Sequence, residues 1–343
     1  MFDYTLPPEL IAHEPARERD SSRLFIYDTA SDTVSFDTFG HLAHYLPQNS
    51  FLVINDTKVV PAHIEVRKET GGKVELLLLL NEWRPGDVTV RCLSDRKITI
   101  GQVLTGSQGL TFTVKGQQEN VFEIAPNMPV ADLLLLLEVI GTTPVPRYLQ
   151  PIPLNEQAAR KRYQSIFAQK PASVAAPTAS LHFTPAVFKS LDQQHIPQAT
   201  VTLHVGLGTF APVTSQQFAD KKLHREFVAI SPEEAMSING WKAGGKKLVA
   251  VGTTATRVLE SRSENGQVTA GEGFTDIFII PGYSFQAVDG LITNFHLPNS
   301  SLMMLVQALL EHKKAKRGLK ELYKIAIQEK FRFYSFGDAM LIL

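Results

Sequence analysis

The sequence predicts an α/β protein in which a mostly parallel sheet with flanking helices carries an inserted small antiparallel β-barrel domain. Short apolar runs followed by turns and helical segments occur early in the chain and again throughout its second half, the order expected of such a sheet. Between them, residues from 71 to about 125 form short alternating runs separated by turn residues, as in small barrels. We therefore assign residues 1–66 and 150–343 to an α/β domain that carries most of the site, and residues 67–149 to the barrel.

Five apolar runs are predicted to be strands of the α/β sheet. They occupy residues 50–54, 200–203, 247–251, 275–280 and 289–292. Each run ends in polar or glycine-rich residues, and several lead into helical segments. Because ligands of open α/β sheets lie beyond the carboxyl ends of the strands, we expect these ends to form one shared site.

Four alternating runs are predicted to be strands of the barrel. They occupy residues 73–76, 87–92, 110–114 and 120–124, and turn residues such as those at 107–109 separate them. The close spacing of these runs is typical of antiparallel strands joined by tight turns.

The composition is that of a soluble globular protein of 343 residues. A single cysteine, Cys92, excludes a disulfide framework and favours the reducing cytoplasm. No apolar run is long enough to cross a membrane. The 34 basic residues balance 34 acidic ones, so a nucleic acid would have to bind a local basic patch, such as residues 160–162 or 312–317.

The segment 176–185 is the first candidate part of the site. Small residues precede Thr184 and Pro185, which can cap and begin a helix, and His182 lies close by. A helix start of this kind can hold an anion or an adenine-ribose group, with the histidine as acid or base. A tight turn with a hydrogen-bonded histidine explains the same residues.

The segment 204–210 contains paired glycines, Gly206 and Gly208. Their backbone amides could approach a ligand closely, or the glycines could simply form a bend at a strand end. The third glycine and the downstream acidic residue of a dinucleotide-binding motif are missing, which argues against Rossmann-type binding.

The segment 252–257 is a predicted turn from strand to helix. The hydroxyl groups of Thr253 and Thr254 could bind a ligand or cap the helix. Arg257, one turn further on, is expected to have an anionic partner if it is half-buried.

The segment 293–298 offers amide donors and a titratable ring beside an aromatic side chain. A stacked purine could use Asn294, Phe295 and His296 together. The alternative is a buried turn in which Asn294 and His296 bond to the backbone.

His224 and Glu226 are two residues apart, which in a strand places them on one face. They could form a catalytic base with the group that orients it, or an exposed ion pair. The histidines of the chain lack the HxH and HExxH spacings of metal ligands, so no metal site is expected.

Taken in order, these segments resemble the S-adenosylmethionine:tRNA ribosyltransferase-isomerase family of queuosine biosynthesis. The similarity spans nearly the whole chain. Besides the segments above it includes residues 6–12, 19–24, 55–62, 71–75 and 333–340.

The resemblance implies a cytoplasmic monomer that takes S-adenosylmethionine as cosubstrate and needs no tightly bound cofactor. The other substrate would be the anticodon loop of a queuosine-family tRNA, carrying 7-aminomethyl-7-deazaguanine at the wobble position. The products would be epoxyqueuosine-tRNA, adenine and methionine. Such a reaction needs a base for C5′ of the cosubstrate, an acid for the departing adenine and donors for the ribose oxygens.

The resemblance also leads to a hypothesis for the site residues. His182 and His296 are placed nearest the reacting ribose, and His224 and Glu226 complete the candidate catalytic set. The residues expected to bind substrate are Asn55, Asp56, Thr57, Thr178, Ser180, Phe183, His204, Gly206, Gly208, Thr209, Phe210, Thr253, Thr254, Arg257, Tyr283, Thr293, Asn294 and Phe295.

At four positions the chain departs from the family pattern. These are Ser180, where glycine is usual, Lys221 for histidine, Ser284 for arginine and Asn299 for lysine. The alternatives left open are therefore a diverged paralogue acting on another RNA or nucleoside, an S-adenosylmethionine-dependent RNA methyltransferase, and a non-catalytic RNA-binding protein.

Overall fold

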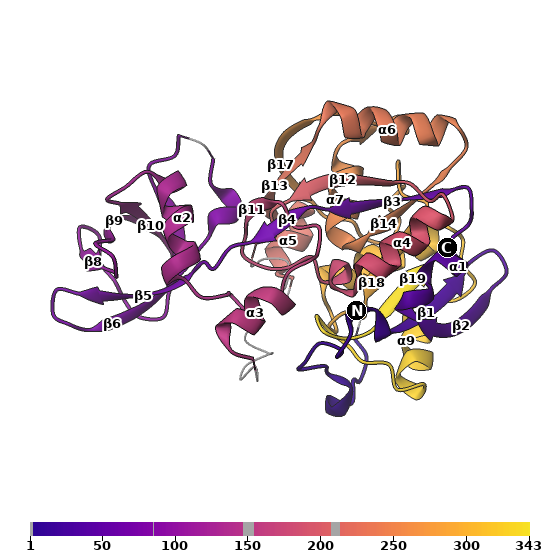
Figure 1. Ribbon diagram of the computed structural model, residues 1–343, viewed down its shortest axis with the longest axis horizontal. Coiled ribbons are helices and arrows are strands. Elements are labelled where there is room, and N and C mark those ends of the chain that lie inside the picture. Colours follow the sequence, from indigo (N-terminus) through magenta and orange to yellow (C-terminus); the bar gives the residue numbers. More distant parts are fainter. Residues whose placement is uncertain (1–2, 85, 147–153, 207–212) are drawn as a thin grey trace.

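The computed structural model describes residues 3–84, 86–146, 154–206 and 213–343, and Figure 1 shows a larger α/β body beside a smaller barrel. A nine-stranded sheet runs through the larger body in the order β17-β13-β12-β3-β14-β18-β19-β1-β2. Its strands are β1 (Arg23–Asp28), β2 (Thr33–Thr38), β3 (Ser50–Asn55), β12 (Gln198–Leu203), β13 (Lys222–Ile230), β14 (Lys247–Val251), β17 (Gly271–Ile277), β18 (Gly290–Asn294) and β19 (Ala339–Ile342).

The centre of this sheet is parallel and its flanks are mixed. Strands β12, β3, β14 and β18 are neighbours and all run the same way. Pairings of β12 with β13, β13 with β17, β18 with β19 and β1 with β2 are antiparallel, whereas β1 pairs with β19 in parallel. The predicted fold class is confirmed, with the correction that the sheet is mixed rather than mostly parallel.

Alternation along the central strands separates two hydrophobic cores. Phe51 and Val53 of β3 point to one face of the sheet and pack in the core between that face and its helices. Leu52 and Ile54 point to the opposite face and pack in the second core. The first face is covered by α6 (Pro232–Ala243), α7 (Gly252–Ser261), α8 (Ser301–His312) and α9 (Leu319–Gln328), and the second by α1 (Leu42–Tyr45) and α4 (Pro185–Gln193).

The inserted domain is a closed barrel of six antiparallel strands with a hydrophobic core of its own. The helix α2 (Val130–Ile140) packs against this core through Leu133 and Leu137. The barrel strands are β5 (His63–Lys68), β6 (Lys73–Leu78), β7 (Val90–Ser94), β8 (Val103–Thr105), β9 (Thr111–Gln118) and β10 (Val121–Pro126).

Two short parallel strands, β4 (Thr57–Val59) and β11 (Lys170–Ser173), pair where the chain leaves and re-enters the larger body. Gly141 lies at this junction against the carbonyl of Pro61, where a Cβ would sit 1.9 Å from that oxygen. The division at residues 67 and 149 stays a prediction: residue 67 falls inside β5, and residue 149 lies outside the described residues.

The remaining elements are short or lie at the edges. The described chain contains no helix long and apolar enough to cross a membrane, and the thiol of Cys92 is buried and unpaired. The short and edge elements are α3 (Glu156–Arg162), α5 (Ser215–Asp220), β15 (Ser263–Glu264) and β16 (Gln267–Val268).

Candidate functional site

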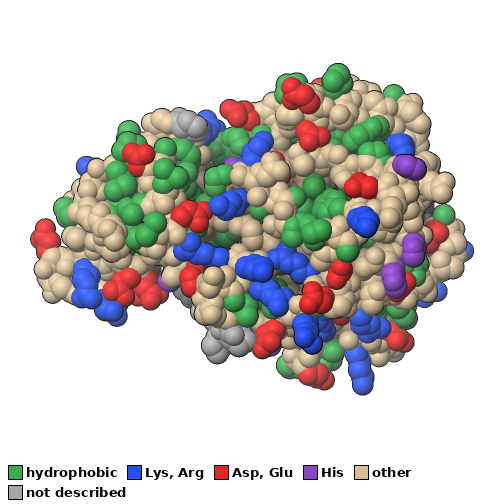
Figure 2. All heavy atoms as spheres, in the orientation of Figure 1, with side chains coloured by type: hydrophobic (Ala, Val, Ile, Leu, Met, Phe, Trp, Pro, Cys, Tyr) green, Lys and Arg blue, Asp and Glu red, His purple; other side chains and the backbone are tan. Residues whose placement is uncertain are grey.

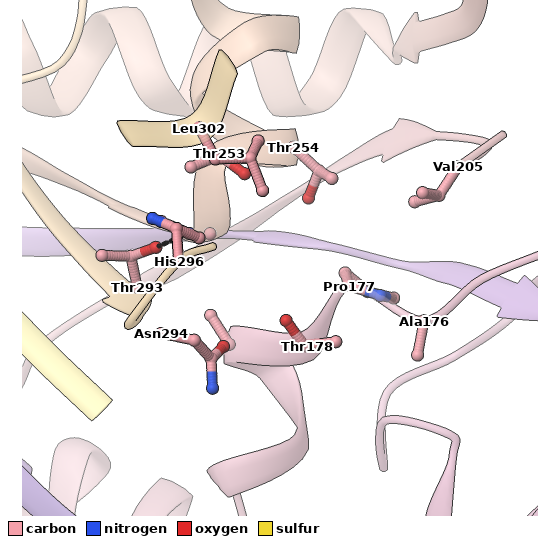
Figure 3. Close-up of a pocket in the computed structure, with 12 residues that line it drawn as sticks. Ala176, Pro177, Thr178, Val205, Thr253, Thr254, Thr293, Asn294, His296 and Leu302 are labelled. Atoms are coloured by element: carbon pink, nitrogen blue, oxygen red, sulfur yellow. Dashed lines mark hydrogen bonds between the residues drawn. The ribbon is translucent and has the colours of Figure 1, made fainter. Parts of the chain in front are cut away.

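A small pocket opens where the central parallel strands end, as expected for an open α/β sheet. Its free volume of about 20 Å³ holds little more than one water-sized group, so it marks where the strand ends converge rather than a complete ligand cavity. Figure 3 shows its side chains arriving from the start of the helix that follows β14, the end of β18, the chain just after β12, the start of α8 and the segment before α4. The lining residues are Ala176, Pro177, Thr178, Ala179, Val205, Gly252, Thr253, Thr254, Thr293, Asn294, His296 and Leu302.

The start of α7 forms one wall of the pocket. Gly252 has a φ of +87°, a backbone conformation that favours glycine, and turns β14 directly into the helix. The N-cap position is Val251, which makes no side-chain cap, so the threonines do not cap the helix. The buried hydroxyl of Thr254 has no hydrogen-bond partner among the described residues and stays available to a ligand. The first backbone N–H groups of a helix add partial positive charge at this wall.

Asn294 forms the opposite wall and connects the pocket to His182. Its amide nitrogen lies 3.1 Å from Nε2 of His182, whose Nδ1 lies 2.7 Å from the hydroxyl of Ser22. Ser22 donates to the carbonyl of Arg19, so the hydroxyl is free to accept from Nδ1–H of His182. This direction leaves Nε2 as the acceptor from Asn294, and the buried Oδ1 of Asn294 has no partner within the described chain. In Figure 3 the nitrogen of Asn294 points away from Thr253 and Thr254.

His296 lies deeper in the same wall. Its Nε2 is 3.1 Å from the hydroxyl of Thr293, and its backbone N–H donates to the hydroxyl of Tyr323 over 2.9 Å. Phe295 beside it points the other way, into an aromatic cluster with Phe331 and Phe333. The predicted stacking of a purine on Phe295 is therefore contradicted, since this ring is fully buried in the core.

Burial keeps both histidines neutral. It lowers the pKa of His182 to about 4 and that of His296 to about 3. A neutral imidazole cannot act as an acid near pH 7, and a pKa this low makes it a weak base. The arrangement therefore supports hydrogen bonding to a ligand by His296 and positioning of Asn294 by His182, which itself does not line the pocket.

The polar residues at the end of β3 and just after it form hydrogen bonds with neighbouring strands rather than lining the pocket. Asn55 donates to the carbonyl of Leu203 and accepts from its backbone N–H, which ties β3 to β12. Asp56 accepts from the hydroxyl of Thr202, and burial raises the pKa of its carboxyl. The hydroxyl of Thr57 lies 2.9 Å from Nδ1 of His204.

His204 stacks on Phe227, and burial lowers the pKa of its imidazole to about 4. Neither His204 nor Asn55, Asp56 and Thr57 line the pocket. The structure thus groups Asn55, Asp56, Thr57 and His204 with each other, behind the strand ends.

A buried ion pair joins Arg257 to Glu226, and both side chains are at most 4% exposed. Glu226 also accepts from the backbone N–H of Gly206 over 2.8 Å, which holds the chain just after Val205 of the pocket. The backbone of Gly206 lies close to Asn81 rather than to the pocket, because a Cβ on Gly206 would lie 2.7 Å from the amide nitrogen of Asn81. Arg257 thus has the anionic partner that the sequence predicts, supplied by the protein itself.

The predicted pairing of His224 with Glu226 is not formed. The register of β13 shifts between Lys222 and Glu226, so His224 lies exposed while Glu226 points into the body. The period of two that the prediction assumed fails at this irregularity.

Several other predicted residues lie away from the pocket. Phe183 is a core residue packed against Phe39, and Tyr283 reaches the carboxyl of Glu260 near the far end of α7. Ser180 is fully buried with an unpartnered hydroxyl next to the pocket wall at Ala179. Three predicted residues lie outside the described part of the chain, namely Gly208, Thr209 and Phe210.

Three of the four departures from the family pattern are surface positions. Lys221 and Asn299 are exposed and have positive φ values of 53° and 57°, and Ser284 is exposed as well. Ser180 is the departure that is buried beside the pocket.

The sequence prediction missed several residues that shape this region. Ser22 and Tyr323 fix the two histidines from distant parts of the chain, and nothing in their local sequence signals it. Val205 and Leu302 line the pocket as apolar neighbours of predicted residues, where their position in sequence could have suggested it. Among the described residues, no group of histidine, cysteine and acidic side chains could hold a metal ion.

The chain is similar to known proteins in both sequence and structure. The sequence profile of the family described as queuosine biosynthesis protein matches residues 1–342. The S-adenosylmethionine:tRNA ribosyltransferase-isomerase of Geotalea uraniireducens is 43% identical over 99% of this chain and 98% of its own. The protein of the same name from Desulforamulus reducens is 42% identical over 100% and 98%. A solved S-adenosylmethionine tRNA ribosyltransferase from Thermotoga maritima superposes with a TM-score of 0.55 at 31% identity, over 100% of this chain and 99% of that one.

Proposed function

The chain belongs to the queuosine biosynthesis protein family and transfers and isomerises the ribosyl group of S-adenosylmethionine onto tRNA, and we propose that the reacting ribose of the adenosyl group binds against the polar residues of the pocket at the ends of β14 and β18. The base modified is 7-aminomethyl-7-deazaguanine at the wobble position, and adenine and methionine leave. The family match argues against two alternatives raised by the sequence, an RNA methyltransferase and a non-catalytic RNA-binding protein.

One observation carries the placement of the substrate. Two buried polar atoms, Oγ1 of Thr254 and Oδ1 of Asn294, line the same pocket without a protein partner among the described residues. An unsatisfied buried polar group costs about 1–3 kcal/mol, so such a pair at one place favours a polar ligand that completes both. The hydroxyls of a ribose supply donors for Oδ1 and both donors and acceptors for Oγ1.

The surrounding groups suit the developing charge of the reaction. The positive end of α7 faces the same space and favours negative charge on a ribose oxygen. His296 is a neutral hydrogen-bonding group at the pocket, and His182 holds the amide of Asn294 in one orientation. We assign no proton transfer to either ring, because burial keeps the pKa of each imidazole well below 7.

The remaining expectations belong to the same proposal. The enzyme works as a monomer in the cytoplasm, where its tRNA substrate lies, without a tightly bound cofactor. Residues 1–66 and 150–343 form the catalytic domain and residues 67–149 the barrel domain. The reduced, buried Cys92, whose thiol pKa burial raises to about 12, is compatible with that compartment.

The test compares Thr254→Val with Thr256→Val. Both replace a buried threonine of α7 with an isosteric residue, but the hydroxyl of Thr256 bonds to the carbonyl of Gly252 inside the helix and does not line the pocket. With S-adenosylmethionine and tRNA bearing the aminomethyl-deazaguanine base, adenine release is the readout. Thr254→Val should lower kcat/KM for S-adenosylmethionine about tenfold, the equivalent of about 1.4 kcal/mol.

Thr256→Val should keep the kcat/KM of the parent enzyme once circular dichroism shows that it is folded. Equal losses in both variants would mean that the threonines matter only to the helix, and would overturn the placement of the substrate. Formation of S-adenosylhomocysteine in place of adenine would indicate methylation and contradict the reaction itself.

A further inference from the structure

A second pocket lies on the other side of His182 from the pocket at the strand ends. It is lined by Arg19, Ser22, Arg162, His182, Ser335 and Gly337, among others. His182 lines this second pocket and contacts the first only through Asn294, because its Nε2 faces Asn294 of the first pocket while its Nδ1 faces Ser22 of the second. The side chains of His182 and Asn294 would therefore separate a group bound in the second pocket from the reacting adenosyl group.

Two arginines dominate the charge of this second pocket. Arg19 donates to the carbonyls of Gln164 and Lys161, each over 2.6 Å, and Arg162 donates to the carbonyls of Ala16 and Arg17, each over 3.0 Å. These bonds to neutral acceptors fix both guanidinium groups but leave their charges in place. Burial and the nearby charge of Arg162 lower the pKa of Arg19, which shows that the two cations lie close together.

No carboxylate in the described part of the chain neutralises this pair. Within the described ranges, neither Arg19 nor Arg162 takes part in an ion pair, and the same holds for Arg17 and Lys161 beside them. By contrast Arg160, on the same helix α3, pairs with both Glu138 and Glu156. Half-buried arginines usually have an anionic partner, so two that lack one in a shared pocket indicate an anion from outside.

The position of this pair suits a nucleic acid. Figure 2 shows Lys and Arg side chains gathered between the barrel and the larger body, in the region of the view where Figure 1 places α3. The chain has no net charge, so it attracts a polyanion only through a local cluster of this kind. Guanidinium groups bind phosphate oxygens in a bidentate way, which gives orientation as well as attraction.

We propose that Arg19 and Arg162 form a subsite for a backbone phosphate of the tRNA, next to the nucleotide being modified. The inference rests on the proposed function, because it places this phosphate beside the pocket assigned to S-adenosylmethionine. The arginines then fix the register of the anticodon strand, so that the wobble base reaches the adenosyl group across Asn294.

The test measures tRNA binding and turnover for Arg162→Gln, Arg162→Lys and Lys189→Gln. Arg162→Gln removes a charge at the subsite, and Lys189→Gln removes the charge of an exposed lysine of α4 that forms no ion pair with any described residue. Arg162→Gln should raise KM for tRNA about tenfold, leave KM for S-adenosylmethionine unchanged and reduce the slope of log K against log salt by about one. Lys189→Gln should change neither the KM values nor the slope.

Arg162→Lys separates charge from structure. Lysine keeps the charge and loses the bonds to the carbonyls of Ala16 and Arg17, so the salt slope should return to that of the parent. If Arg162→Lys behaves like Arg162→Gln, the arginine only ties the N-terminal segment to α3 and the subsite is refuted. A rise in KM for S-adenosylmethionine instead of tRNA would assign the anion to the methionine carboxylate and equally overturn it.

Failure of the phosphate subsite can be distinguished from failure of the proposed function. An unchanged salt slope in Arg162→Gln, together with a loss of adenine release in Thr254→Val, would remove the phosphate subsite and leave the adenosyl pocket standing. Unchanged adenine release in Thr254→Val, together with a reduced salt slope in Arg162→Gln, would remove the adenosyl pocket and leave the phosphate subsite standing.

Discussion

Two histidines, His182 and His296, are buried and a third, His204, is half-buried, and each makes the stability of the fold depend on pH. Burial lowers the pKa of His182 and His204 to about 4 and that of His296 to about 3. In the unfolded chain each has a pKa of about 6.5. Between these values the unfolded state binds more protons than the folded one, so folding becomes less favourable as pH falls from about 6.5 towards 4.

We predict that His204→Asn flattens this dependence. Asparagine keeps a polar group near the hydroxyl of Thr57 but cannot titrate. The change of the unfolding free energy with pH should fall by up to about 1.4 kcal/mol per pH unit between pH 4 and 6.5. Urea unfolding at pH 7, 6 and 5 measures it, and the exposed His13 replaced by asparagine is the control. An unaltered pH dependence in His204→Asn would show that His204 has the same pKa in the folded protein as in the unfolded chain.

The candidate site could be predicted from sequence only in part, and the reason lies at this scale. Sequence shows which polar residues follow a strand, and Thr178, Thr253, Thr254, Asn294 and His296 do meet at one pocket. It does not show which side chains use up their hydrogen bonds inside the protein. Asn55 ends β3 and Glu226 lies within β13, yet backbone groups occupy Asn55, and a backbone group and Arg257 occupy Glu226, and only the three-dimensional contacts reveal it.

Among the elements, α7 connects the site to the body through the ion pair of Arg257 with Glu226 of β13. Removing one partner of a buried pair leaves an uncompensated charge, which costs about 3–5 kcal/mol. We predict that Arg257→Met destabilises the fold by this amount, whereas Arg257→Met combined with Glu226→Gln recovers a large part of it. Denaturant unfolding of the single and double variants measures the coupling. A single variant within 1 kcal/mol of the parent would show that Glu226 is satisfied without Arg257.

In the nine-stranded sheet, the strands that the sequence predicts best are those buried on both faces. Strands β3, β12, β14 and β18 read as continuous apolar runs because helices cover both sides of the sheet centre. The edge strand β17 begins at Gly271 with polar and glycine residues, so its start was placed too late. Direction is the part that no local pattern encodes: the antiparallel flanks depend on which distant strand each one meets.

At the scale of the whole molecule, the junction between the barrel and the larger body depends on close backbone contact at Gly141. A Cβ on this residue would lie 1.9 Å from the carbonyl oxygen of Pro61, so backbone must move. We predict that Gly141→Ala lowers the unfolding free energy by about 3 kcal/mol or more, since strain of this kind is among the large mutational effects. Thermal unfolding followed by circular dichroism is the measurement.

Gly240→Ala is the matched control. Gly240 lies inside α6, where a Cβ would meet open space within 4 Å, so alanine should stabilise the helix by about 0.5–1 kcal/mol. Two glycine-to-alanine changes of opposite sign would locate the sensitivity at the junction. A loss of stability in both would point instead to a general intolerance of the substitution.

The pairing of β1 with β19 bears on how this chain is made. The strand β1 sits between β2 and β19, and β19 in turn is the only described link between β1 and the parallel centre. During synthesis on the ribosome β1 and β2 therefore emerge early and wait as a hairpin, while the barrel, contiguous from His63 to Pro126, can complete its own ring. The nine-stranded sheet is complete only after β19 has been translated. Until then a nascent chain exposes the aromatic face of β1, so chaperone protection should be needed for most of its synthesis.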